Sequence, residues 1–295
     1  MTAATAASDP ALPPGLSVRS LADADLEAAM ALSIEAGWNQ AAEDWRFFLQ
    51  FGRTLCLTRN DRPVATAAIL PYAPRFAWIS MVLVTAAERR QGLARWLLHR
   101  CVADVVAAGL VPILDATPAG RSVYLGLGFR DAWGMRRLVG RADGGAAVAN
   151  AAITIRALVD SDWPQLVELD ATVFGADRSA LLQSLVQRLP PAALVADCNG
   201  RIAGFSLGRN GRVMAQLGPI VAADRDTAIA LVTAMLPRVS GPVALDVPDC
   251  HAALEHWLVA RGFSAERPLT RMVHQRAIAF EDTARLFAIA GPELG

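Results

Sequence analysis

The chain has 295 residues, of which 54% are hydrophobic and 19% are charged, and its formal net charge is +0. That length allows two domains of ordinary size, each with its own core. The balanced charge argues against broad electrostatic capture of nucleic acid or of an anionic membrane, so we expect neither as a partner. All 28 basic residues are arginines, which excludes lysine as a catalytic base or Schiff-base nucleophile.

The first residues, MTAATAASDPALPPG, lack the basic segment and apolar core of a signal peptide. We expect residues 1–15 to form a disordered tail and the protein to be cytoplasmic. No apolar run approaches the ~20 residues of a membrane-spanning helix. The four cysteines form no CxxC pair and the four histidines are scattered, so we expect reduced thiols and no metal site.

The sequence contains two copies of one pattern. SVRSLADADLEAAMAL (17–32) aligns without gaps with TIRALVDSDWPQLVEL (154–169). CLTRNDRPVATAAIL (56–70) matches LVADCNGRIAGFSLG (194–208), and in both an Asn-Asp or Asn-Gly turn between apolar runs predicts a β-hairpin. The later matches are SMVLVTAAE (80–88) with QLGPIVAAD (216–224), VPILDATP (111–118) with PVALDVPD (242–249), and GLGFRDAWGMRR (126–137) with ARGFSAERPLTRM (260–272).

Each copy is predicted to run strand, helix, second helix, two or three antiparallel strands, helix, strand, helix, strand. This order is typical of a mixed α/β (α+β) fold, with a mostly antiparallel sheet flanked by helices. The Gly/Ala-rich stretch GRADGGAAVANAA has no periodicity and is the natural linker. We expect a first copy at 16–140, a linker at 141–152, a second copy at 153–277, and a C-terminal helix or tail at 278–295.

The stretch ERRQGLARWLLHR (88–100) follows the branched, apolar run AWISMVLV. A strand, a short basic turn with one glycine and then a helix predict an anion site, because a helix N-terminus presents unpaired N–H groups and a positive dipole end. Gly92 has no Cβ, so the backbone can approach a phosphate closely. Arg89, Arg90 and Arg95 supply compensating charge.

These residues carry a resemblance to the GNAT acyltransferase superfamily. The family's motif, Arg/Gln-x-x-Gly-x-Gly/Ala at a helix start, is matched by residues 89–94. A second motif, a tyrosine four residues before Gly-Phe, is matched by Tyr124 before Gly128 and Phe129. The resemblance covers residues 16–140 strongly and 153–275 weakly, through the internal repeat. It implies two tandem GNAT-like domains, an active N-terminal one and a degenerate C-terminal one.

The resemblance further implies an N-acetyltransferase that uses acetyl-CoA and no metal. The enzyme would move an acetyl group directly to a primary amine of a small molecule or to a peptide N-terminus. Pantetheine would run along the strand before the motif, and the diphosphate would lie at the motif itself. The residues assigned to the cofactor are Val82, Leu83, Val84, Arg89, Arg90, Gln91, Gly92, Leu93, Ala94 and Arg95.

Tyr124 is the family-matched general acid for the coenzyme A thiolate, because a phenol of pKa ~10 can donate its proton to a thiolate of similar basicity. A tyrosine here could also simply pack under the cofactor. Asp115, at the end of the predicted strand VPILD, is a candidate general base. Asp246 has the same place in the second copy, so a shared structural role such as capping the next helix is as plausible, and an ordered water could be the base instead.

The segment around GWNQAAEDW, where the family places its acceptor-binding loops, contains Glu35, Trp38, Glu43 and Asp44. We assign Trp38, Glu43 and Asp44 to acceptor binding, with core packing as the alternative for the aromatic residues. The acceptor itself and the oligomeric state are not determined by the sequence, which leaves a homodimer open.

The second copy lacks the features of the motif. Residues 225–230 stand where the motif would be, with Ala228 in place of the glycine and Asp226 adding a negative charge. Leu258 stands at the position of Tyr124. We therefore expect coenzyme A to bind only the first copy. A non-catalytic acyl-CoA sensor is the alternative function.

Overall fold

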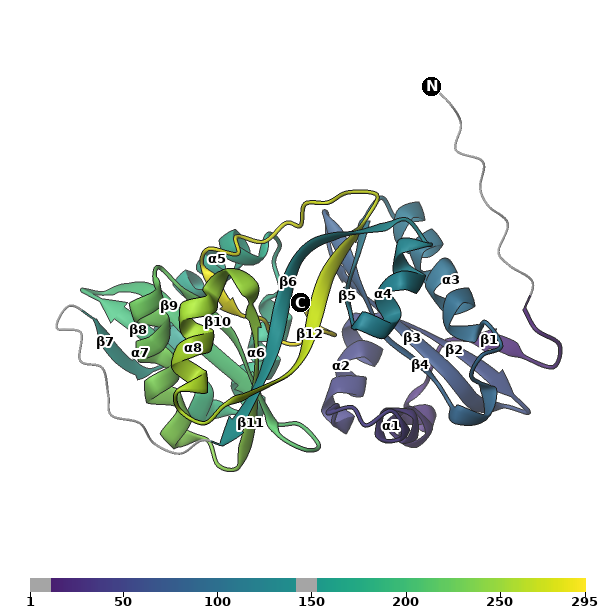
Figure 1. Ribbon diagram of the computed structural model, residues 1–295, viewed down its shortest axis with the longest axis horizontal. Helices are drawn as coiled ribbons and strands as arrows, with labels where there is room; N and C mark the ends of the chain where they lie inside the picture. The colour runs from purple at the N-terminus through teal and green to yellow at the C-terminus, as the bar shows by residue number, and fades with distance from the viewer. Residues whose placement is uncertain (1–11, 142–152) are drawn as a thin grey trace, which may run out of the picture. The chain divides into compact units, whose positions relative to one another are not determined.

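The computed structural model describes residues 12–141 and 153–295, and the first copy follows the predicted element order (Figure 1). The expected second helix and three consecutive strands are all present. Its elements are β1 (Ser17–Arg19), α1 (Leu26–Glu35), α2 (Ala42–Phe51), β2 (Arg53–Arg59), β3 (Arg62–Tyr72), β4 (Phe76–Val84), α3 (Leu93–Ala107), β5 (Val111–Ala116), α4 (Pro118–Leu125) and β6 (Phe129–Arg141).

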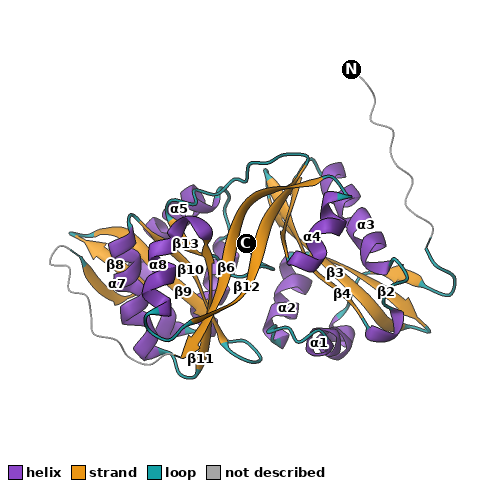
Figure 2. Ribbon diagram, viewed as in Figure 1, coloured by secondary structure: helices purple, strands orange, loops and turns teal. Residues whose placement is uncertain are grey.

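The second copy repeats this order element by element (Figure 2). All but the first residue of the predicted linker, and most of the predicted N-terminal tail, lie outside the described residues. The elements are β7 (Thr154–Ala157), α5 (Trp163–Phe174), α6 (Ser179–Arg188), β8 (Leu194–Cys198), β9 (Arg201–Arg209), β10 (Ala215–Ala222), α7 (Arg225–Met235), β11 (Pro242–Pro248), α8 (Ala252–Val259) and β12 (Ser264–His274).

Both predicted hairpins are present. Asn60 and Asp61, which join β2 to β3, have φ angles of 50° and 61°. Asn199 and Gly200, which join β8 to β9, have φ angles of 54° and 82°. Two left-handed central residues give the turn whose twist matches the flanking strands, and Asn, Asp and Gly tolerate that conformation best.

The described chain divides into two compact units. The first unit ends at Pro112 and leaves out Tyr72–Arg75, whereas the second contains that short segment and Ile113–Gly295. Strands β1 to β4 of the first unit follow one another in sheet order. In the second unit the order is β5-β12-β6-β11-β10-β9-β8-β7, and α7 and α8 together cover one face of it (Figure 1).

The order of the second unit shows that the last strands of the two copies are interleaved. Strand β12 of the second copy pairs antiparallel with β5 of the first, whereas β6 of the first copy pairs antiparallel with β11 of the second. Strands β12 and β6 also pair with each other. The compact units therefore do not follow the boundaries of the sequence repeat.

Two equivalent buried ion pairs lie across these interleaved strands. Arg271 on β12 is in register with Asp115 on β5, and Arg137 on β6 is in register with Asp246 on β11. Each guanidinium donates twice to its carboxylate, over 2.8 and 2.7 Å in the first pair and over 2.9 and 2.7 Å in the second. Arg137 and Arg271 occupy the same position in the two copies, and so do the two aspartates. The two ion pairs are therefore equivalent to each other in the repeat.

The C-terminal segment differs from its prediction. The expected helix is absent, and residues Leu286–Ala288 form a short strand, β13, that pairs with β10. Leu286, Phe287, Ala288 and Ile289 are each at most 2% exposed. A continuous apolar run can be a buried strand or a buried helix, and here pairing with β10 decides between them.

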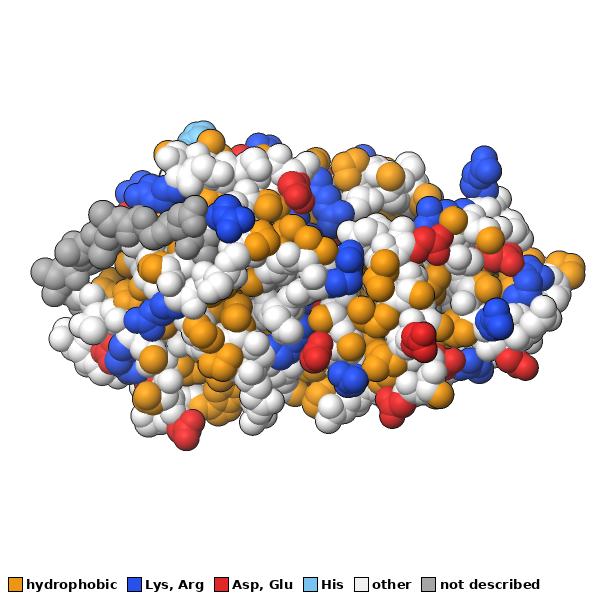
Figure 3. All heavy atoms as spheres, turned by 90° about the horizontal axis from the view of Figure 1, so that it is seen from below, with side chains coloured by type: hydrophobic (Ala, Val, Ile, Leu, Met, Phe, Trp, Pro, Cys, Tyr) orange, Lys and Arg blue, Asp and Glu red, His pale blue; other side chains and the backbone are white. Residues whose placement is uncertain are grey.

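The charges on the surface are mixed. On the face drawn in Figure 3, arginine and acidic side chains are interspersed rather than gathered by sign, in keeping with the balanced composition. Among the residues that the structure describes, no helix combines the length and apolar character needed to cross a bilayer.

We expect Arg137→Ala to lower the free energy of unfolding by about 3 kcal/mol, because it leaves the buried Asp246 carboxylate unpaired. Urea denaturation measures the change. Arg225→Ala is the control, since Arg225 pairs with Asp226 on the surface with side chains 59% and 64% exposed, and surface pairs contribute little. Equal losses in the two variants would contradict a structural role for the buried pair.

Candidate active site

The turn between β4 and α3 has a backbone shaped by left-handed residues. Arg90 has φ 64° and Gly92 has φ 82°. Gly92 is the N-cap of α3, where no side chain caps the helix, and its carbonyl accepts the first helical hydrogen bond from Trp96 N at 2.9 Å. The amides of the first turn are therefore left for an outside acceptor, which favours an anion.

Arginine side chains surround this helix start. Arg90 and Arg95 are exposed, and among the described residues neither forms an ion pair with a carboxylate. Arg89 is held in place, because its Nε donates to the carbonyl of Val84 at 3.0 Å. The β4–α3 turn thus combines unpaired amides with surplus positive charge.

Glu35, at the end of α1, holds the same turn. Its carboxylate accepts hydrogen bonds from the Thr85 hydroxyl at 2.9 Å and from the Ala86 amide. It also lies 3.5 Å from the Arg89 guanidinium. By its place in the sequence Glu35 belongs to the predicted acceptor segment, and its contact across fifty residues leaves no local pattern that would indicate another role. In the structure, Glu35 supports the β4–α3 turn.

Strand β4 is irregular where the cofactor was predicted to run. Met81 has φ 53°, and its carbonyl accepts a hydrogen bond from the Thr66 hydroxyl at 3.0 Å. After this irregularity Val82 and Val84 are half-buried, whereas Leu83 is buried. The alternation places Leu83 toward the core and leaves the other two side chains on the more open face.

Tyr124 lies on α4 in the second unit. Thr117 caps this helix, with its hydroxyl accepting from Gly120 N at 3.3 Å. The Tyr124 ring lies over Gly120, where an added Cβ would be 3.1 Å from the phenolic oxygen, and it meets Phe129 edge-on at 6.2 Å. Burial raises the pKa of Tyr124 above its ordinary value, so the phenol carries its proton at neutral pH.

Asp115 is buried rather than open to a substrate. Its side chain and that of Arg271 are both 0% exposed, and Arg271 also pairs with Glu281 and stacks over Trp133 at 4.4 Å. Burial raises the pKa of Asp115 to about 6, against the opposing attraction of Arg271. Asp115 does not cap α4, because Thr117 does so.

The three predicted acceptor residues have different surroundings. Asp44 is 1% exposed and accepts a hydrogen bond from Ala41 N at 2.7 Å, which helps to cap α2. Glu43 is exposed and lies 3.8 Å from Arg46. Trp38 is half-buried between α1 and α2. Neighbouring Trp45, which donates to the Ser33 hydroxyl at 3.1 Å, belongs to the core.

The second copy has a different helix start. Helix α7 begins at Arg225, which aligns with Arg89, so it starts four residues earlier than α3. Its N-cap is Asp224, whose carboxylate accepts from Thr227 N at 2.8 Å, and Ala228 N donates to the Asp224 carbonyl at 3.1 Å. The residues of α7 that align with the first turn of α3 therefore lie within the helix, where their amides donate to helix carbonyls.

No metal-binding group is evident in the described ranges, 12–141 and 153–295, where no three His, Cys, Asp or Glu side chains are grouped to hold an ion. The four cysteines are free thiols, with Cys56 and Cys101 buried.

One α/β architecture is present twice in the chain, and its first copy has the glycine-led helix start that is typical of acyl-CoA-dependent transferases. Comparison with family models agrees. Residues 20–129 match the acetyltransferase (GNAT) family, and residues 166–288 match an acetyltransferase (GNAT) domain. The chain belongs to the GNAT acetyltransferase superfamily and carries two of its domains.

Relatives along most of the chain support this assignment. YitH of Bacillus subtilis (strain 168), named as an uncharacterized N-acetyltransferase, is 24% identical over 263 residues, which are 88% of this chain and 92% of that protein. The fold is similar to that of a candidate acetyltransferase from Pyrococcus horikoshii, with TM-score 0.79, 18% identity and coverage of 97% and 98% of the two chains. A tandem GNAT protein from the clavulanic acid biosynthesis pathway has TM-score 0.63, 14% identity and coverage of 88% and 98%.

We expect Glu35→Ala to weaken acetyl-CoA binding about tenfold, because the lost hydrogen bonds would release the β4–α3 turn. Calorimetric titration measures the dissociation constant. Glu27→Ala, which removes an exposed glutamate from the same helix, is expected to leave it unchanged. An undisturbed affinity in the Glu35 variant would show that the turn holds its shape alone.

Proposed function

We propose that this protein is an acetyl-CoA-dependent N-acetyltransferase whose first copy binds the cofactor. It transfers the acetyl group directly to a primary amine of a small molecule or to a peptide N-terminus. The observation that carries this proposal is the start of α3, where Gly92 leaves the helix uncapped and Arg90 and Arg95 have no carboxylate partner among the described residues. Such a site is suited to a diphosphate.

Different residues of the proposed site bind the cofactor and catalyse the transfer. Amides at the start of α3 and the arginines around it bind the diphosphate, and the backbone of Val82 to Val84 binds the pantetheine arm as an added strand would be bound. The acceptor amine attacks the thioester carbonyl, the carbon–sulfur bond breaks, and the Tyr124 hydroxyl gives its proton to the leaving thiolate. The proton that the amine loses passes to solvent water, which returns a proton to the Tyr124 phenolate. An acid must be protonated at the start, and the Tyr124 phenol meets this condition at neutral pH, with its pKa raised further by burial.

The contacts of Asp115 favour one of its two predicted roles, a structural role rather than that of general base. A general base needs an open carboxylate oxygen toward its substrate, and both oxygens of Asp115 accept from Arg271. The equivalent pair in the second copy has the same form. These contacts support a positioning role for Asp115, in which it anchors β5 ahead of α4, over its prediction as the base.

The differences at α7 support binding of coenzyme A by the first copy alone. Asp224 occupies the helix start with its own carboxylate, and Leu258, at the position of Tyr124, is fully buried. A negative charge at the start of α7 repels a diphosphate. The leucine side chain cannot act as a general acid, because it has no ionisable proton. The second copy therefore has a supporting role in this proposal.

Gly92→Asp tests the diphosphate site. We expect it to weaken acetyl-CoA binding about 100-fold, because a like charge beside the diphosphate costs several kcal/mol. Gly109→Asp is a matched control at the other end of α3, since Gly109 also has a positive φ (74°) and open space around an added Cβ. Calorimetry should show normal binding in the control; equal loss in both variants, or in neither, would refute the site.

Tyr124→Phe tests the acid. We expect kcat to fall about 100-fold with little change in acetyl-CoA affinity, since only proton transfer is lost. Tyr72→Phe, at the only other tyrosine, is the control. It should keep kcat but lower the melting temperature, because the buried Tyr72 hydroxyl donates to the carbonyl of Leu294 at 2.5 Å.

A thiol-release assay across a panel of amines measures the turnover of both variants. Full activity in Tyr124→Phe would reject the acid role. Acetyl-CoA binding without thiol release for any amine would favour the non-catalytic sensor.

A further inference from the structure

Strands β10 and β11 of the second copy separate soon after they meet. They pair in parallel only at Ala215 with Val243 and at Gln216 with Ala244. Beyond that point β13 lies between them (Figure 2). On one side it pairs with β10, with Ala288 opposite Ile220, and on the other side Ile289 N donates to the carbonyl of Asp246 on β11 at 3.1 Å.

The part of β10 that β13 covers is equivalent to the predicted cofactor strand of the first copy. Residues 218–220 align with Val82–Val84. Gly218 lies so close to the C-terminal segment that a Cβ there would be 1.9 Å from the carbonyl oxygen of Ile289. The backbone that the first copy offers to pantetheine is thus in contact, in the second copy, with the chain itself.

The start of α8 holds this segment from the side. His251 Nε2 lies 2.8 Å from the carbonyl of Thr283 and 3.1 Å from that of Leu286. Two acceptors at one nitrogen require that it carry the proton. The His251 ring also stacks on Phe287, with centroids 3.9 Å apart and planes at 22°.

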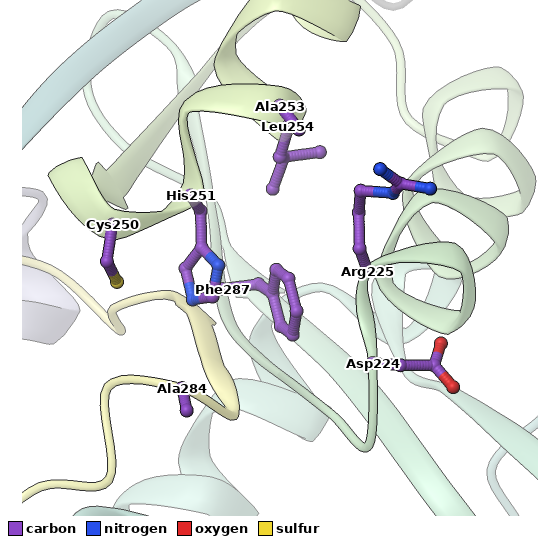
Figure 4. Close-up of a pocket in the computed structure, with 8 residues that line it drawn as sticks. All are labelled: Asp224, Arg225, Cys250, His251, Ala253, Leu254, Ala284 and Phe287. Carbon is purple, nitrogen blue, oxygen red and sulfur yellow. The ribbon is translucent and has the colours of Figure 1, made fainter.

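A cavity of about 270 Å³ remains beside β13 (Figure 4). Asp224 and Arg225 line it from the start of α7, and His251, the N-cap of α8, and Leu254 line it from the other side, with Phe287 of β13 between them. In the first copy the helix start equivalent to α7 is the proposed diphosphate site. The cavity therefore lies beside the helix start that is equivalent to the proposed diphosphate site.

We infer that residues 283–289 occupy, in the second copy, the place that the pantetheine arm takes in the first, so that this domain is filled permanently by its own chain. The inference rests on the proposed function only for the course of pantetheine along β4. The strand supplies backbone hydrogen bonds on both sides and buries four apolar residues, and a tethered segment competes at a high effective concentration. The filled groove links β10 to β11, and β11 carries Asp246 of the buried pair.

Hydrogen exchange and calorimetry on the full chain test this inference. We expect the amides of residues 286–289 to exchange as slowly as those of β10, and acetyl-CoA to bind with one site per chain. Rapid exchange of these amides would overturn the inference, and so would a second acetyl-CoA site in the second copy. Absence of any acetyl-CoA binding would instead overturn the proposed function, while exchange would still decide whether the groove is filled.

Ile289→Pro removes the amide that donates to Asp246. We expect exchange of the amides of residues 286–288 to become at least about tenfold faster and the melting temperature to fall, with acetyl-CoA binding by the first copy retained. Ile278→Pro is the matched control, because Ile278 is 71% exposed, and it should change neither.

His251→Ala provides a milder second variant that keeps the backbone intact. It should accelerate exchange in the same segment and nowhere in the first unit. Unchanged exchange in both the Ile289 and His251 variants would show that β13 is not held by these contacts and would overturn the inference.

Discussion

The reciprocal pairing of Arg271 with Asp115 and of Arg137 with Asp246 is the constraint on which the second unit depends. Each arginine is on the last strand of one copy and each aspartate on an inner strand of the other. A slip of one residue along either strand would turn these charges to the wrong face and leave them buried without partners. The pairs therefore fix the register of four interleaved strands, and with it the positions of the helices that follow β5 and β11.

The two copies share this frame but differ at the helix that follows the fourth sheet strand of each. In the first copy a left-handed glycine delays the helix and leaves its amides free. In the second, Asp224 starts the helix four residues earlier and satisfies an amide with its own carboxylate. Strand β13 then fills the gap between β10 and β11. In our proposal, the chemistry of one N-cap and one added strand therefore gives a cofactor site in the first copy and a self-filled groove in the second.

Interactions between close neighbours explain most of what could be predicted. The Asn-Asp and Asn-Gly hairpins, the order of elements in both copies and the glycine at the start of α3 all follow from short patterns, because a turn or a helix start is decided by a few adjacent residues. Contacts across the chain could not be predicted in this way. Glu35 reaches a turn fifty residues away, and Asp115 meets an arginine 156 residues away.

The sequence by itself determined the repeated α/β plan, because periodicity and turn signals lie in consecutive residues, and its motifs were enough to indicate the family by resemblance. Only the tertiary structure decided that the last strands of the two copies interleave, that Asp115 is held by Arg271, and that the C-terminal apolar run is a strand in a groove rather than a helix. The physical reason is that β-pairing and buried charge pairing join residues far apart in the chain. Their free energy depends on which partner is present, and no local pattern of residues specifies that partner.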